Sequence, residues 1–221
     1  MLQLSQFEAE LRDYPDQAAA SYFLTGLREG FRTGFVASSV SLRSASTNMS
    51  SALVHPSVID AYLETEVSCG RVAGPFTTLP CPELHISRFG VIPKNNQPGQ
   101  WRLILDLSSP KGHSVNDGIP KPLFSVHYVT LDSFIQGIMA QGRGTLMAKF
   151  DVASAYCNVA IHPQDHSLLG MRWHGKYYVD MALPFVLRSA PYSFTAIADV
   201  VKWMLTHNYG LLSFVITWMI S

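Results

Sequence analysis

The sequence predicts an α+β fold, in which helices come first and strands mixed with helices follow. Three observations lead to this prediction. Helix signals dominate the first 70 residues, two β-rich hairpin patterns lie in the middle, and one long amphipathic segment occupies about residues 190–210. The chain has no internal repeat, and its elements do not show the regular alternation of strand and helix that is typical of parallel sheets.

The N-terminal part carries three helix patterns. Residues 5–8 have the order of a capping box, and Asp16 stands where it can cap a second helix. A third helix begins at Pro56, which suits a first helical turn, and Gly70 ends it. Between the second and third helices, residues 39–52 are rich in serine and are predicted to form a linker.

Two hairpins are predicted after the third helix. "HISRFGVIPK" and "QWRLILDL" are β-rich runs on either side of the turn mixture "NNQPG". Every other residue of the second run is apolar from Trp101 to Leu107, which places Arg102 on the opposite face. The second hairpin turns at His174 and Gly175. The shorter runs "LMAKFD" and "CNVAI" are also predicted to be strands.

Two further helices are predicted. Asp132 is expected to cap a short helix that ends near Gly142. Pro191 begins a longer helix that Gly210 ends. The apolar face of this longer helix carries Phe194, Ile197, Val201 and Leu205.

The composition limits the class of protein. A chain of 221 residues forms one large domain or two small ones, and 48% hydrophobic residues suffice for a core. Charged residues make up only 14%, which is consistent with a piece of something larger. The formal net charge is zero, which argues against strong electrostatic binding of nucleic acid. A local basic face is nevertheless expected within residues 88–122, which hold Arg88, Lys94, Arg102, Lys111 and Lys121 against Asp106 and Asp117.

The three cysteines lie far apart in the sequence and form no CxxC pair, which argues against a zinc site. The odd count and the lack of a signal-peptide pattern indicate a reducing, intracellular setting, in the cytoplasm or the nucleus. No apolar run reaches the roughly 20 residues that cross a bilayer, so we expect no membrane partner. The apolar tail at residues 214–221 is open to two readings, as a strand cut short or as a weak membrane segment.

The stretch "LMAKFDVASAYCNVAIHP" contains the strongest candidate for chemistry. Asp151 ends an apolar run, and a buried carboxylate costs free energy unless it is paired or bound to a metal. The pattern alone leaves two alternatives open, a metal ligand or a cap of the turn that follows the strand. His162 and His166, with Asp165 between them, could form another metal-binding site on one face of a helix, although Pro163 favours a surface turn there.

The surroundings of Asp151 resemble a known family. "WRLILDL", "FDVASAY" and "LPFVLRSAPYSF" occur in the order and at the spacing of the fingers strand and the first two catalytic motifs of reverse transcriptases. The chain is most similar to the polymerases of tyrosine-recombinase-type retrotransposons, over about residues 50–210. The resemblance implies a helical leader with its linker in 1–52, the fingers region in 53–145 and a partial palm in 146–221 of a right-hand polymerase. The thumb and any RNase H domain are expected to be absent.

The resemblance also implies a site for two Mg²⁺ ions, one activating the primer hydroxyl and one neutralising the triphosphate. Asp151 would be the shared catalytic carboxylate, with the backbone carbonyl of Val152 as a further metal ligand. The expected partners are an RNA template, a DNA primer and deoxynucleotides, and no oligomeric state is predicted. The implied deoxynucleotide contacts are Lys94, Arg102, Ala153, Ser154, Ala155, Tyr156 and Phe185.

These contacts have distinct implied roles. The fork of Arg102 would hold the incoming phosphates, with Lys94 as a second contact, and the amides of residues 153–155 would face the triphosphate. The ring of Tyr156 would lie under the sugar and exclude a 2′-hydroxyl, and Phe185 would lie beside the sugar. Simpler alternatives stay open: Tyr156 as a core residue, and the two basic residues as solvated hairpin charges.

Two features depart from the family pattern. Val186 occupies a position that is usually glycine, which predicts a clash or a shifted loop where the backbone approaches nucleotide and template. The Tyr-x-Asp-Asp motif, whose carboxylates complete the metal site, is missing, because no acidic residue follows Asp199. The chain is therefore expected to be catalytically incomplete.

The genetic code offers an account of the missing motif. Trp218 and Met219 have one codon each, TGG and ATG, and the codon of Ile220 begins with AT. In the shifted frame this run contains GAT-GAT, which encodes Asp-Asp. "VITWMIS" is therefore interpreted as the out-of-frame reading of the catalytic hairpin, after a frameshift between about Gly210 and Val215.

The expected function is that of a reverse-transcriptase-family fragment, by descent an RNA-directed DNA polymerase and inactive as this chain. The alternative is a non-catalytic nucleic-acid or protein-binding module derived from a retroelement and kept for its basic fingers face. A third possibility is a translation product without a function.

Overall fold

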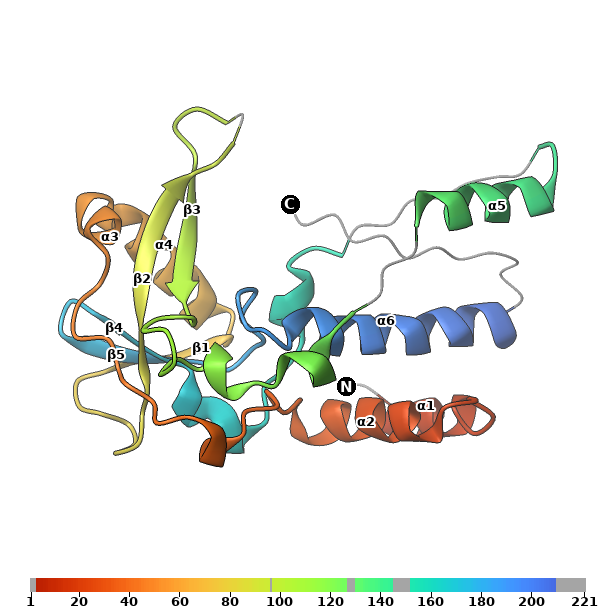
Figure 1. The fold of residues 1–221 in the computed structure, drawn as a ribbon, viewed down its shortest axis with the longest axis horizontal. Helices are drawn as coiled ribbons and strands as arrows, with labels where there is room; N and C mark the ends of the chain where they lie inside the picture. Colours follow the sequence, from red (N-terminus) through yellow and green to blue (C-terminus); the bar gives the residue numbers. More distant parts are fainter. Residues whose placement is uncertain (1–2, 96, 127–129, 145–151, 210–221) are drawn as a thin grey trace.

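A computed structural model of the chain describes residues 3–95, 97–126, 130–144 and 152–209. The fold is a mixed α+β structure, as the sequence predicts. Figure 1 shows the strands together with α3 and α4 in one part of the molecule, and α1, α2 and α6 beside them in another. The C-terminal tail and the run "LMAKFD", including Asp151, lie outside the described residues.

The helices are α1 (Leu4–Glu10), α2 (Gln17–Glu29), α3 (Ser50–Val54), α4 (Pro56–Ser68), α5 (Leu131–Gln141) and α6 (Ala190–His207). Short 3-10 helices are η1 (Ala37–Ser39), η2 (Asn116–Gly118), η3 (Lys121–Phe124), η4 (Ala155–Asn158) and η5 (Pro163–Leu168). The strands are β1 (Val72–Phe76), β2 (Ile86–Pro93), β3 (Trp101–Asp106), β4 (Gly170–Trp173) and β5 (Lys176–Asp180).

The described strands form a five-stranded sheet in the order β1-β5-β4-β2-β3. Both predicted hairpins are confirmed, because β2 pairs antiparallel with β3 and β4 pairs antiparallel with β5. The only parallel contact among these strands joins the start of β2 to β4. The turn between β4 and β5 has positive φ at His174 (46°) and Gly175 (73°), as a type I′ turn requires. The rest of β2 continues past β4 and forms, with β3, a hairpin that projects from the sheet (Figure 1).

Helix boundaries follow the sequence signals at α2 and α4. Asp16 accepts a hydrogen bond from the backbone N–H of Ala19 at 3.0 Å, and Gly30 ends α2 with φ of 94°. Pro56 opens α4, whose inward residues Ile59 and Leu63 are buried.

Two predicted caps are wrong. The expected capping box at residues 5–8 does not form, because Ser5 lies inside α1 and the N-cap is Gln3, which makes no side-chain cap bond. The cap of α5 is Thr130, whose hydroxyl accepts from the N–H of Ser133, and Asp132 lies in the first turn. In both cases the helix begins a residue or two before the residue with the expected pattern, and Gly142 ends α5 as predicted.

The serine-rich segment that was predicted to be a linker instead runs along β2 and satisfies its backbone. The Ser44 hydroxyl accepts from the N–H of Ile86 at 2.9 Å, and the Asn48 side chain accepts from the N–H of Phe89 at 2.9 Å. Ser51 accepts from the N–H of Val91 at 3.1 Å. Polar side chains thus replace a neighbouring strand, which explains why a segment of this composition is ordered against the sheet.

The predicted strand "CNVAI" is also wrong. Residues 155–158 form the 3-10 helix η4, and the extended residues that follow make only isolated bridges, Ala160 to Ala182 and Ile161 to Phe31. Each bridge pairs one residue with one partner and is not extended to the next residue, so these residues form no strand of the sheet. The long C-terminal helix is confirmed as α6, with Pro191 in its first turn.

Three apolar clusters hold the described elements together. The largest lies between the sheet and α4 and includes Ile59, Phe89, Leu105 and Met171. A second cluster joins α1, α2 and α6 and includes Leu11, Phe23, Val200 and Met204, with Ile197 and Val201 packed against it. The third is small and lies over β2 and β5, with Leu84, Ile86 and Val179. The largest cluster also supports the turn at η4, where Tyr156 packs against it.

Candidate functional site

The turn that follows Asp151 is a tight loop closed by the side chain of Asn158. Ser154 has a left-handed backbone with φ of 51°, and η4 starts directly after it. The Asn158 amide donates to the carbonyl of Ala153 at 3.0 Å. A non-glycine residue in this conformation costs about 1–3 kcal/mol, and such outliers cluster at ligand sites. Ala153 and Ser154 are exposed and Ala155 is half-buried, so these backbones lie near the surface.

Tyr156 joins this turn to two other elements. Its ring lies 5.5 Å from Phe185, in the loop between β5 and α6, and 5.2 Å from Phe194, in the first turns of α6. Phe194 is buried, whereas Phe185 is 47% exposed. The contact with Phe185 is edge-on, and a contact of this kind contributes about 0.5–1.5 kcal/mol beyond burial. Tyr156 is therefore a half-buried ring packed on the core, and it also lies against an exposed ring.

The structure thus brings together two of the predicted deoxynucleotide contacts, Tyr156 and Phe185, from segments that are 29 residues apart in the sequence. Val152 is exposed as well, at 51%. The roles of Asp151 and of the Val152 carbonyl as metal ligands stay predictions, because Asp151 lies outside the described residues. Among the described residues, no group of three or more His, Cys, Asp or Glu side chains is arranged to hold a metal ion.

Arg102 and Lys94 lie on a separate element, the β2–β3 hairpin. Arg102 is exposed on β3 opposite Ile92, and the N–H of Lys94 donates to the Gln100 carbonyl at 2.9 Å, which closes the hairpin end. Arg88, on the same hairpin, forms an ion pair with Asp106 at 2.9 Å. Within the part of the chain that the structure describes, Arg102 and Lys94 form no ion pair, so their charges are not neutralised there.

Val186 follows Phe185 and is packed, half-buried, against the largest apolar cluster. Its carbonyl accepts a hydrogen bond from the side chain of Asn116 at 3.0 Å. The valine side chain is thus accommodated within the loop itself. The predicted clash concerns the approach of nucleotide and template and stays a prediction.

The alternative metal face at residues 162–166 is occupied by other interactions. Asp165 is buried and bound by Arg32 at 2.8 Å, and the ring of His166 contacts the Ile161 carbonyl at 2.9 Å. The His162 ring accepts from the N–H of Gln164, as a cap of η5 does. The surface turn is confirmed, and its aspartate has a structural partner.

Sequence reasoning missed a group of titratable side chains under the turn at η4. Glu66 of α4 forms an ion pair with Arg71 at 2.6 Å, and Asp180, at the end of β5, is buried. Burial, and then the charge of Glu66, raise the pKa of Asp180 to about 8. Burial likewise raises the pKa of the Cys157 thiol. One signal was present, because Glu66 lies on the same helical stripe as Ile59 and Leu63.

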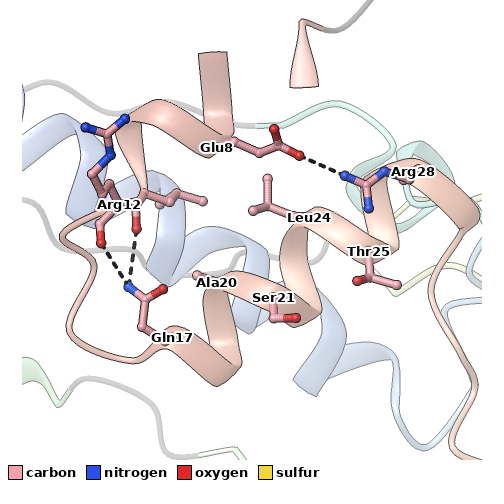
Figure 2. Close-up of a pocket in the computed structure, with 9 residues that line it drawn as sticks. Glu8, Arg12, Gln17, Ala20, Ser21, Leu24, Thr25 and Arg28 are labelled. Carbon is pink, nitrogen blue, oxygen red and sulfur yellow. Dashed lines mark hydrogen bonds and ion pairs between the residues drawn. The ribbon is translucent and has the colours of Figure 1, made fainter. Parts of the chain in front are cut away.

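A shallow pocket of about 240 Å³ lies between α1 and α2. Figure 2 shows Glu8 and Arg28 facing each other at its edge, 2.8 Å apart, and Gln17 bonded to carbonyls at the end of α1. None of the predicted site residues lines it. The described residues also contain no helix that is both long and apolar enough to pass through a bilayer.

The fold belongs to the class seen in reverse transcriptases. The chain is similar to a solved structure of prototype foamy virus protease-reverse transcriptase, a CSH mutant, with a TM-score of 0.53 and 17% identity over 92% of this chain. It is also similar to a foamy viral protease-reverse transcriptase solved in complex with an RNA/DNA hybrid, with a TM-score of 0.52 and 17% identity over 95% of this chain.

The chain spans only 27% and 28% of these two neighbours, so it corresponds to a part of them. No family model matches the sequence, and no curated protein matches it. At this identity the comparison establishes the shared fold.

Proposed function

We propose that this chain is a reverse-transcriptase-family fragment, of the retrotransposon type, that binds an RNA–DNA hybrid and does not polymerise by itself. The contact between Tyr156 and Phe185 carries the proposal. The family resemblance implies that these two residues border the sugar of the incoming nucleotide, and the fold places their rings against each other from separate segments. One of the similar structures was solved with an RNA/DNA hybrid, which supports this choice of ligand.

The charges around the β2–β3 hairpin favour a phosphate backbone as partner. Asp106 is occupied by Arg88, and Asp117 accepts hydrogen bonds from the hydroxyl and N–H of Ser114 and from the N–H of Gly112. Arg88 and Asp106 neutralise each other, and Asp117 keeps its negative charge. The four basic residues that remain against this one carboxylate are Lys94, Arg102, Lys111 and Lys121. Basic residues that contact a phosphate backbone bind it by releasing counterions, and the fork of arginine adds two-point contact.

Catalysis requires more metal ligands than we propose for this chain. Two Mg²⁺ ions need several hard oxygen ligands, and in this proposal Asp151 with the Val152 carbonyl provides only part of the set. No acidic residue follows Asp199, so the second group of family carboxylates has no counterpart in this sequence. We infer that Mg²⁺ binds weakly and that the chemical step does not proceed.

Hybrid binding is tested by fluorescence anisotropy with a labelled RNA–DNA duplex over a range of salt concentrations. Arg102→Ala is expected to weaken binding roughly fivefold and to lower the salt dependence by about one ion. Arg12→Ala is the matched control, because Arg12 is also an exposed arginine but lies in the turn between α1 and α2, where it lines the pocket of Figure 2. If the unmodified chain fails to bind the hybrid at low salt, the proposal is wrong.

The lack of catalysis is tested by primer extension with purified protein and Mg²⁺. We expect no incorporation above background. Robust extension that disappears in Asp151→Ala would show that the chain is an active polymerase. Extension that survives this substitution would point to a contaminating enzyme, so the variant separates the two sources.

The proposed origin of the missing motif is tested on the gene. A nucleotide sequence in which the frame shifted after about Gly210 encodes Asp-Asp, followed by further polymerase-like sequence, is the expected result. A shifted frame without Asp-Asp would refute the frameshift and leave the hybrid-binding proposal standing.

A further inference from the structure

The loop after β3 is closed by a backbone hydrogen bond and by one acceptor side chain, the Asp117 carboxylate. The N–H of Asn116 donates to the Leu107 carbonyl at 2.9 Å, which brings the loop back to the end of β3. The Asp117 carboxylate accepts from the Ser114 hydroxyl at 2.6 Å and from the Gly112 N–H at 2.7 Å. These hydrogen bonds, that of Ser114 first, hold the pKa of Asp117 below its ordinary value. The loop is therefore a rigid support.

Asn116 projects from this support to the loop that carries Phe185. Its amide nitrogen donates to the Val186 carbonyl at 3.0 Å and to the Ser108 hydroxyl at 2.9 Å. Its amide oxygen accepts from the N–H of Arg188 at 2.7 Å. The side chain is 95% buried, since Asn116 is 5% exposed, and three hydrogen bonds of fixed direction use both amide hydrogens and the oxygen.

A second link joins the same two loops. The Arg188 guanidinium donates to the Ile119 carbonyl at 2.9 Å. The backbone on both sides of Leu187, at the Val186 carbonyl and the Arg188 N–H, is thus anchored, and the Leu187 side chain is buried. Phe185 is the exposed ring at the start of this anchored stretch and lies against Tyr156.

We propose that Asn116 is a positioning residue, which holds the loop of residues 184–189 so that Phe185 stays against Tyr156 and the pair discriminates the sugar of a nucleotide. The part that concerns the nucleotide rests on the proposed function. Asparagine is suited to this place because it offers donors to a carbonyl and an acceptor to an N–H. Aspartate at the same place would set a carboxylate oxygen against the Val186 carbonyl.

The position of Phe185 is measured first, with 4-fluorophenylalanine incorporated at that residue and fluorine NMR of the full chain. Asn116→Asp is expected to shift and broaden the fluorine signal because the loop loses its anchor. Asn48→Asp is the matched control: Asn48 also bridges two segments, from the Phe89 N–H to the Arg172 carbonyl, but touches neither loop. The control is expected to leave the signal unchanged at a similar cost in stability.

If Asn116→Asp does not fold, Arg188→Met removes only the second link and is expected to shift the same signal by a smaller amount. An unchanged fluorine signal in a folded Asn116→Asp, or in Arg188→Met where the first variant fails, overturns the proposal. Equal shifts in Asn116→Asp and Asn48→Asp overturn it as well, because they would indicate a general loss of structure.

Sugar discrimination is measured next, as the ratio of affinities for Mg-dGTP and Mg-GTP in the presence of an RNA–DNA hybrid with a templating cytosine. The unmodified chain is expected to prefer the deoxynucleotide, and Asn116→Asp is expected to reduce this preference about tenfold, which corresponds to one buried hydrogen bond. A preference that is unchanged while the Phe185 signal shifts overturns the role in discrimination. If the unmodified chain binds neither nucleotide, the nucleotide site itself is wrong, and the fluorine result still decides whether Asn116 holds the loop.

Discussion

The guanidinium of Arg32 binds both carboxylate oxygens of Asp165, with Nε at 3.0 Å from one and Nη2 at 2.8 Å from the other. Thr33 adds its backbone N–H at 2.6 Å and its hydroxyl at 3.0 Å. The two partners are 133 residues apart in the sequence, so the contact fastens the segment after α2 to η5. Burial opposes the charge on Asp165, but the hydrogen bonds from Arg32 and Thr33 outweigh it and keep the pKa below its ordinary value.

Asp165→Ala is expected to lower the free energy of unfolding by about 2–4 kcal/mol, because Thr33 loses the partner of its buried N–H. Arg32 contributes less to the loss, since its side chain is 54% exposed and can be hydrated. Urea denaturation measures the change. Glu8→Ala is the control: it breaks an ion pair with Arg28 whose side chains are 48% and 51% exposed, and it should cost less than about 1 kcal/mol. Equal costs for the two variants would contradict this interpretation.

The contribution of Asp180 to stability depends on pH in the sense opposite to that of Asp165, because the pKa of Asp180 is raised and that of Asp165 is lowered. Its carboxyl is buried, and its pKa is raised to about 8, so the folded chain holds a proton that the unfolded chain releases near pH 4. The stabilisation is present below about pH 4 and is lost as the pH rises towards 8. Asp180→Asn mimics the protonated form. We therefore expect this variant to be more stable than the unmodified chain at pH 8.5 by a few kcal/mol, and nearly equal to it at pH 4.

The difference between the two proteins, measured by urea denaturation at both pH values, isolates Asp180 from other titrating groups. Asp165→Asn serves as a comparison, because the pKa of Asp165 is lowered and its contribution is lost as the pH falls below about 4. A constant difference between Asp180→Asn and the unmodified chain at all pH values would show that Asp180 does not hold a proton in the folded state.

Local signals were sufficient for most of the regular structure. The Asp16 cap, Pro56 and the helical periodicity of α6 predicted three helices, and the turn residues around His174 predicted a hairpin. These signals act within a few residues, so one sequence displays them. The family resemblance implied that Tyr156 and Phe185 both border the sugar, and the structure adds that their rings are in contact. No local rule relates two segments that meet only through tertiary packing.

Partners at long range could not be predicted. The pattern around Asp165 indicates a surface turn, and nothing in it shows that Arg32 is the partner. The serine-rich segment has the composition of a linker, yet Ser44, Asn48 and Ser51 bind the backbone of β2. Composition measures the tendency of a segment to stay hydrated, and it carries no information on which backbone groups elsewhere need a partner.

His85 is 3% exposed, and within the described residues neither of its ring nitrogens has a hydrogen-bond partner. Burial lowers its pKa, so the folded chain resists a proton that the unfolded chain accepts near pH 6.5. Folding stability should therefore decrease as the pH falls below about 6.5. His85→Leu is expected to be neutral or stabilising by about 1–2 kcal/mol at pH 7, because it removes two unsatisfied polar atoms.

His85→Leu should lose less unfolding free energy between pH 7 and pH 5 than the unmodified chain, because it lacks the histidine that resists protonation. Urea denaturation at the two pH values measures this difference. A loss of stability in His85→Leu at pH 7 would indicate that the ring has a polar partner in solution and that its neutral form is held for that reason.

Gly26, in the interior of α2, tests local propensity against packing. Alanine is favoured over glycine in a helix by about 1 kcal/mol, so propensity alone predicts that Gly26→Ala stabilises the chain. An added Cβ, however, would overlap the ring of Phe31, which is 3% exposed and held in the largest apolar cluster. Overpacking of this kind costs about 1–3 kcal/mol. We therefore expect a net destabilisation of about 1–2 kcal/mol in thermal or urea unfolding.

The companion variant Phe31→Leu makes room for the methyl group. The double variant should lose about 1 kcal/mol less stability than the sum of the losses of the two single variants, because the leucine side chain of Phe31→Leu leaves room for the methyl group that Gly26→Ala adds. Ser21→Ala, on an exposed position of the same helix, should change stability by less than about 0.5 kcal/mol and controls for propensity. A stabilising Gly26→Ala, or strict additivity in the double variant, would mean that Phe31 moves aside at little cost and that the glycine is not required for the close approach of this ring to α2.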